Sequence, residues 1–175
     1  MVARDRATMG VGMRRVLMLV LVTVIAAGAG LGAQMRSGKV DARFVGNWRL
    51  VSFVNIDEKG ATTASRFTGG RIMYDAAGQM AAQLTYADRP RLSSPATDAE
   101  RAAAYTGFLS YYGGYEIDEA TAKVTHHVEA STNPNWPNTD LIRYFEFADG
   151  GHTLKLSIRN AAGRTTGTLT WTRIR

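Results

Sequence analysis

The chain contains no cysteine and no apolar run long enough to cross a membrane. With none of the 175 residues a Cys, disulfides and lipid attachment at a thiol are both excluded, and the fold must be stabilised by packing alone. The longest apolar stretch, residues 16–27, is interrupted only by Thr23. It is shorter than the roughly 20 residues that a spanning helix needs.

Several sequence signatures of chemistry are also missing. There is no Gly-x-Ser-x-Gly motif for a serine nucleophile. The Gly69-Gly70 and Gly113-Gly114 pairs lack the Lys and the helix start of a phosphate-binding loop. The arginines are scattered rather than gathered in a stripe with aromatics, which argues against nucleic acid as a partner.

The first 33 residues read as a secretory signal peptide. An arginine-rich leader precedes the apolar stretch, and small residues ending at Ala33 follow it. Cleavage after Ala33 fits best, cleavage after Ala29 also fits, and an uncleaved anchor is the alternative. Removing four Arg and one Asp lowers the formal net charge from +6 to +3. We therefore expect an exported protein, periplasmic or secreted, with no stable membrane span after processing.

Residues 34–43 form a short polar lead-in, and residues 44–175 carry one domain of successive strands. The strands alternate with Asp/Asn/Gly turns, which predicts an antiparallel meander. The eight predicted strands are Phe44–Ile56, Arg71–Asp75, Gln79–Tyr86, Gly113–Asp118, Lys123–Ser131, Leu141–Ala148, Thr153–Asn160 and Thr165–Arg175. Eight strands are enough to close a small up-and-down barrel, so the fold class is all-β.

One segment interrupts this pattern and predicts a single inserted amphipathic helix. Thr97 and Glu100 have the spacing of a capping box. Apolar residues from Ala102 to Tyr112 then share one helical face, and Gly113-Gly114 ends the helix. Thr62–Gly70 is predicted to be a loop.

The order of short motifs resembles the bacterial and fungal lipocalin-like domain family. These motifs are Gly46–Ser52, Gly70–Tyr74, Gly78–Met80, Tyr111–Tyr115, Val124–Val128, Asn133–Trp136, Arg143–Phe145 and Leu169–Trp171. The resemblance implies a calycin-like barrel with a small central cavity and no single activity. It also implies that Trp48 packs across the closed end, with Arg173 lying over it. The other motifs of true lipocalins, and their usual disulfide, are absent.

The His126-His127 strand carries the most chemistry, and two orientations of it are open. Side chains alternate along a strand, so His127, Glu129 and Ser131 share one face and His126 lies on the other. If the polar set faces inward, it can bind a head group or move a proton. If the apolar set faces inward, as is usual, His126 is the cavity residue. His127 and Glu129 lack a third ligand, so no metal is predicted.

Other candidate ligand-binding residues are Tyr74, Tyr112, Trp136 and Arg143. The tyrosines offer aromatic surface with hydroxyl tips, and Trp136 lies on a Pro/Asn loop where it can cover a ligand or plug the barrel. Arg143 is predicted either to clamp a ligand carboxylate or to form a buried ion pair with Glu129 or Glu116.

Three functions follow from these residues. The first is binding of a small, largely apolar molecule with a polar or acidic end, oriented by His127, Glu129 and Arg143. The second is a cavity enzyme, an isomerase, cyclase or hydrolase, in which His127 and Glu129 are the catalytic candidates. The third is a filled barrel that acts through its surface as an envelope interaction module. No cofactor is implied, and we expect a monomer.

Overall fold

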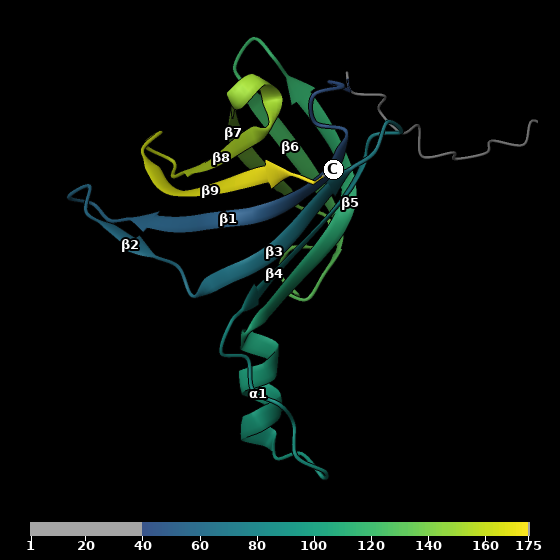
Figure 1. Cartoon of the computed structure of the whole chain (residues 1–175), viewed down its shortest axis with the longest axis vertical. Coiled ribbons are helices and arrows are strands. Elements are labelled where there is room, and N and C mark those ends of the chain that lie inside the picture. Colours follow the sequence, from purple (N-terminus) through teal and green to yellow (C-terminus); the bar gives the residue numbers. More distant parts are fainter. Residues whose placement is uncertain (1–39, 175) are drawn as a thin grey trace, which may run out of the picture. The chain divides into compact units, whose positions relative to one another are not determined.

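The computed structural model describes residues 40–174, which form one ring of antiparallel strands (Figure 1). The predicted signal peptide lies outside the described residues. The strands are β1 (Gly46–Ile56), β2 (Thr62–Ala64), β3 (Phe67–Tyr74), β4 (Gln79–Tyr86), β5 (Phe108–Asp118), β6 (Lys123–Ser131), β7 (Asp140–Ala148), β8 (Thr153–Arg159) and β9 (Thr165–Arg173). The helix α1 (Asp98–Thr106) separates β4 from β5, and the 3₁₀ turn η1 (Asp149–Gly151) separates β7 from β8.

From β3 to β9 each strand pairs with the next along the chain, and β1 pairs with both β3 and β9. These eight strands therefore close an up-and-down barrel, as predicted. The ninth, β2, pairs only with the far end of β1, at Val54–Ile56. It was not predicted, and neither was the early start of β3 at Phe67 instead of Arg71. Both lie in the predicted Thr/Ser/Gly loop, where strand pairing overrides weak local propensity.

One end of the barrel is closed around Phe44 and Trp48, which are both fully buried. The Phe44 ring makes edge contacts with Tyr74, Phe145 and Phe147 at 5.0–5.2 Å between ring centroids. The Trp48 indole donates to the Phe44 carbonyl oxygen at 2.9 Å. This end is thus filled by aromatic side chains.

Arg173, in the last strand, lies over Trp48 with its guanidinium 4.2 Å from the ring centroid. This confirms the stacking that the resemblance implied. Arg173 also donates to the backbone carbonyls of Val45, at 2.7 Å, and Arg43. A Cβ on Gly46 would lie 2.8 Å from the Arg173 Nη1 atom, and Gly46 has a φ of +133°. In the Gly-x-Trp motif, Gly46 therefore leaves the space that lets Arg173 stack on Trp48.

The helix α1 begins as predicted and ends earlier. Thr97 and Glu100 form the capping box. Hydrogen bonds that the Glu100 carboxylate accepts from the Thr97 backbone and from the Ser93 and Thr97 side chains lower its pKa to about 2. The prediction that the helix reaches Gly113 is wrong, because Gly107 ends it. Residues 108–112 instead pair with β4 and β6, so tertiary strand pairing wins over the helical spacing of apolar residues. Figure 1 shows α1 beyond the ends of β4 and β5.

A β-bulge at Glu129 changes the face of every residue that follows it in β6. Tyr112 pairs with Ala130, whereas Gly113 pairs with Val128, so Glu129 is the extra residue. Ser131 consequently pairs with the inward-facing Tyr111 and not with the outer set. The prediction that Ser131 shares a face with His127 is therefore wrong.

The bulge requires glycine on the facing strand. A Cβ on Gly113 would lie 1.9 Å from the His127 carbonyl oxygen and 2.9 Å from the Glu129 nitrogen. We expect Gly113→Ala to lower the free energy of unfolding by about 3 kcal/mol, because backbone must move to admit the methyl group. Urea unfolding followed by circular dichroism measures this change.

The matched control is Gly114→Ala, whose Cβ would meet its nearest neighbour at an ordinary 3.7 Å. This variant should lose less than about 1 kcal/mol. Equal losses in the two variants would contradict the role given to the bulge.

Candidate functional site

A chain of hydrogen-bonded polar side chains runs through the barrel interior. The Tyr74 hydroxyl lies 2.8 Å from His126 Nε2, and the Tyr111 hydroxyl lies 3.0 Å from His126 Nδ1. Tyr74 ends β3 beside Phe44, and the Tyr111 ring packs edge-on against Trp136 at 5.6 Å. The polar chain therefore extends from the closed end towards the loop between β6 and β7.

Local sequence positions all three members inward. In β6, His126 lies between Val124 and Val128 on the buried face, so the ordinary apolar-in orientation places the imidazole in the core. Burial, reinforced by the charge of Arg143, holds the His126 pKa well below its ordinary value. Burial also raises the pKa of both Tyr74 and Tyr111. The three groups are accordingly neutral near pH 7.

The hydrogen count of this chain leaves one donor over. A neutral imidazole carries one N–H donor and one acceptor nitrogen, and each tyrosine supplies one O–H. Two of these three hydrogens form the two bonds to His126. Whichever tautomer His126 adopts, one tyrosine O–H therefore stays available for an acceptor.

Arg143 extends the polar chain with a positive charge. Arg143 pairs in register with the buried Val124, so it faces the interior from β7. Its guanidinium acts on Tyr111 through its charge and as a hydrogen-bond donor, and both effects oppose the burial that raises the Tyr111 pKa. It also donates to the Ile142 carbonyl oxygen at 2.9 Å.

The predicted ion pair of Arg143 with Glu129 or Glu116 is wrong. Glu129 is exposed at the bulge, and Glu116 contacts His127 on the outer face. Within residues 40–174, Arg143 has no carboxylate within ion-pairing distance. The arginine is thus an inward-facing cation beside neutral hydroxyl groups.

Two tryptophans complete the interior. Trp136, on the loop between β6 and β7, is partly buried against the core and lies over Tyr111, as expected of a residue that covers a barrel end. Trp171 is buried in β9, and its indole N–H has no acceptor among the described residues. A buried donor of this kind costs free energy until an acceptor reaches it.

The structure divides the predicted site residues between the two faces of the barrel wall. Tyr74, His126, Trp136 and Arg143 face the interior or its mouth. Tyr112, His127 and Glu129 lie on the outside, and Tyr112 is 54% exposed. Of the two orientations that the sequence left open for β6, the structure has the one in which His126 faces the interior and His127 faces outward.

On the outer face, His127 lies between two carboxylates. His127 Nδ1 is 2.7 Å from Asp140 Oδ1, and His127 Nε2 is 3.6 Å from Glu116 Oε1. These contacts join β5, β6 and β7 across the surface. Within residues 40–174 no cluster of three or more His, Asp or Glu side chains is arranged to hold a metal ion.

Tyr111 is the main functional residue that the site prediction left out. The prediction placed it in a helix, where Tyr112 lay on the apolar face. The alternation of Leu109, Tyr111 and Gly113 against Leu84, Ala82 and Met80 is the signal that finds it.

Fold and interior together define a closed antiparallel barrel that encloses a neutral Tyr–His–Tyr chain and one arginine. The family model of the lipocalin-like domain matches residues 45–174. The chain belongs to the lipocalin-like domain family.

Other comparisons are distant. No curated protein matches the chain. Among solved structures, a redesigned β-barrel aligns with a TM-score of 0.39 and 12% identity, covering 76% of this chain and 93% of the other. In the part of the chain that the structure describes, no helix has the length and apolar character needed to cross a membrane.

The buried His126 predicts a loss of stability in acid. In the unfolded chain His126 takes up a proton below about pH 6.5, whereas the folded barrel keeps it neutral to lower pH. The unfolded state then binds more protons, so the free energy of unfolding falls as the pH drops, by up to about 1.4 kcal/mol per pH unit. Above about pH 6.5 His126 is neutral in both states, so it no longer makes the free energy of unfolding depend on pH.

We expect His126→Gln, whose amide keeps hydrogen-bonding capacity, to show a weaker fall between neutral pH and pH 5. Urea unfolding at several pH values measures it, with His152→Gln at an exposed turn as the control. An unchanged pH dependence in His126→Gln would contradict the assignment.

Proposed function

We propose that this protein binds a small, largely apolar molecule whose acidic end is held inside the barrel by Arg143 and Tyr111. The observation that carries the proposal is a surplus of hydrogen-bond donors in the interior. Arg143 has no carboxylate partner among the described residues, one O–H of the Tyr–His–Tyr chain is left over, and the Trp171 N–H has no acceptor there. An occupant that supplies acceptors, above all a carboxylate, satisfies them.

The protonation states support an anion over a cation. His126 stays neutral because burial and the charge of Arg143 both disfavour a second positive charge. Arg143 is therefore the charge that an acidic group meets, and a guanidinium can bind both oxygens of a carboxylate at once. Among residues 40–174 the buried carboxylate is that of Asp41, which is paired with Arg43. A cationic ligand would therefore place a second positive charge beside Arg143.

The apolar part of the ligand has aromatic surface at the mouth of the barrel. Trp136 and Tyr111 are in edge contact there, and Phe53 and Leu141 lie partly buried against the core. Trp136 contacts the ring of the same tyrosine whose hydroxyl meets His126. Trp136, which would cover the ligand, is thus in direct contact with Tyr111, which would bind its acidic end.

The cavity-enzyme alternative rested on His127 and Glu129, and this geometry does not favour it. Both residues lie outside the wall, so neither shares a site with Arg143. The only histidine in the interior among the described residues is His126, which is saturated by two tyrosines. The remaining alternative is a filled barrel that acts through its surface. In that case the protein would bind no small molecule in its interior. Export, inferred from the leader sequence alone, remains part of the proposal.

We expect Arg143→Gln to weaken binding of decanoate by about tenfold or more, because a charge-assisted hydrogen bond contributes about 1.5–3 kcal/mol. Binding of the neutral analogue decanamide should change far less. Isothermal titration calorimetry, with quenching of tryptophan fluorescence as a second reading, measures both affinities.

His127→Ala is the control for a site-independent effect, since His127 lies on the outer face. Its affinity for decanoate should match that of the unaltered protein. Equal loss for decanoate and decanamide in Arg143→Gln would rule out Arg143 as the carboxylate partner. Failure of the unaltered protein to bind either compound would favour the filled barrel.

A further inference from the structure

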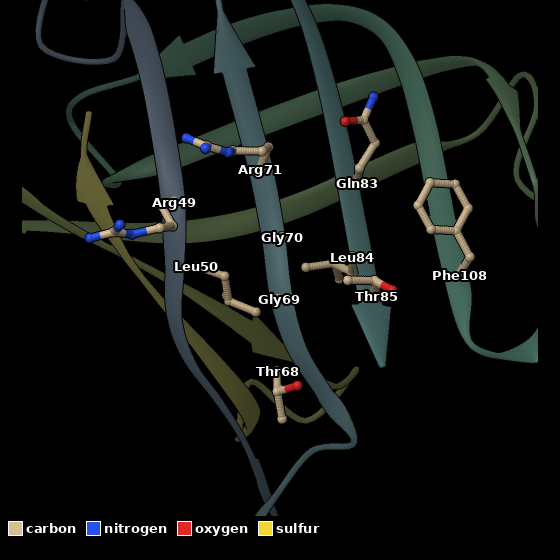
Figure 2. Close-up of a pocket in the computed structure, with 10 residues that line it drawn as sticks. All are labelled: Arg49, Leu50, Thr68, Gly69, Gly70, Arg71, Gln83, Leu84, Thr85 and Phe108. Carbon is tan, nitrogen blue, oxygen red and sulfur yellow. The ribbon is translucent and has the colours of Figure 1, made fainter. Parts of the chain in front are cut away.

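A pocket opens in the barrel wall where β1 and β3 separate, away from the interior polar chain. Its volume is about 410 Å³, within the range of small-molecule sites. Figure 2 shows its lining: Arg49 and Leu50 from β1, Thr68, Gly69, Gly70 and Arg71 from β3, Gln83, Leu84 and Thr85 from β4, and Phe108 from β5. None of these residues takes part in the interior polar chain.

Strand pairing explains why the pocket forms here. The register of β1 with β3 runs from Gly46–Tyr74 to Arg49–Arg71 and stops there. Beyond that pair β1 continues along β9, while β3 stays with β4 through a bulge at Thr68. The two strands therefore separate immediately below the arginine pair.

Two consecutive glycines keep this pocket open. A Cβ on Gly70 would lie 2.6 Å from the Gln83 carbonyl oxygen and 2.8 Å from the Leu84 side chain. A Cβ on Gly69 would lie 3.0 Å from the Thr85 methyl group. In Figure 2 the side chains of Leu50 and Leu84 lie on either side of this bare stretch of β3. The floor of the pocket is therefore backbone and apolar carbon.

The upper rim carries two positive charges that oppose each other. Arg49 and Arg71 are direct register partners on antiparallel strands, and both are exposed. Like charges in that position destabilise a sheet. Within residues 40–174 neither guanidinium forms an ion pair or a side-chain hydrogen bond, unlike Arg43, Arg66, Arg101 and Arg164. A pair that costs stability and has no protein partner fits an anionic ligand.

We propose that this pocket is a binding site for a free anionic amphiphile, separate from the interior site. Its phosphate or carboxylate bridges Arg49 and Arg71, with the Gln83 amide as a neutral donor at the same rim. Its alkyl part covers Gly69-Gly70 between Leu50, Leu84 and Phe108. Two guanidinium groups side by side suit an oxyanion with several acceptor oxygens, because each can donate in a fork.

The test uses octyl phosphate below its micellar concentration and nuclear magnetic resonance of the ¹⁵N-labelled protein. We expect saturable shifts at the Gly69, Gly70 and Phe108 amides. The double variant Arg49→Gln/Arg71→Gln should weaken binding at least tenfold, with a melting temperature that is unchanged or raised because the repulsion is removed. Inorganic phosphate should bind at least tenfold more weakly than octyl phosphate, since it lacks the apolar part.

The matched control is Arg91→Gln/Arg101→Gln, which removes the same charge from exposed positions outside the pocket and should bind normally. Arg143→Gln should also bind normally, which separates this site from the interior one. Equal weakening in the control would overturn the proposal, as would shifts that depend on Arg143. Equal affinities for the two phosphates would overturn the apolar subsite. Cosedimentation with phosphatidylglycerol vesicles that requires Arg49 and Arg71 would overturn the free-molecule assignment.

Discussion

The barrel depends on the contact of Arg173 with Trp48, which joins the last strand to the first. The β1–β9 seam is the only pairing of the ring, within residues 40–174, that unites distant parts of the sequence. Arg173 closes it by stacking on the indole and by donating to backbone carbonyls that precede β1. Gly46 leaves the space for this side chain. Phe44, held by the same Trp48, then seals the end on which the interior polar chain rests.

The inner and outer faces of the barrel wall differ in whether their positive side chains have carboxylate partners. On the outside several cations pair with carboxylates, as in the Lys155–Glu146 and Arg66–Asp88 pairs. Inside, neutral tyrosines and a neutral histidine surround one arginine. Desolvation favours a neutral His126, and the charge of Arg143 reinforces that state, so Arg143 supplies the positive charge of this polar chain. The Arg49–Arg71 pair is the comparable imbalance on the outer wall.

Sequence patterns predicted the strands well and their faces less well. Turn residues and alternation located eight strands, and the Gly-x-Trp pair with Arg173 located the closed end. The helix was overextended because Phe108, Leu109 and Tyr112 also satisfy a helical period, and only pairing with β4 decides between the two. Ser131 was placed on the wrong face because a bulge at Glu129 has no clear local signature. The partner of Arg143 was mispredicted because burial of a charge without a counter-ion depends on tertiary structure.

Closure by a seam between the first and last strands constrains how the chain can fold. Neighbouring strands can pair as soon as each hairpin is made, because their contacts are local in sequence. The ring, however, cannot close until β9 is available, and until then β1 and β8 are open edges with unpaired amides and carbonyls. A partly synthesised chain therefore exposes two unpaired sheet edges and the aromatic side chains of the open interior. Such unpaired edges favour association between chains until the last strand pairs with both of them.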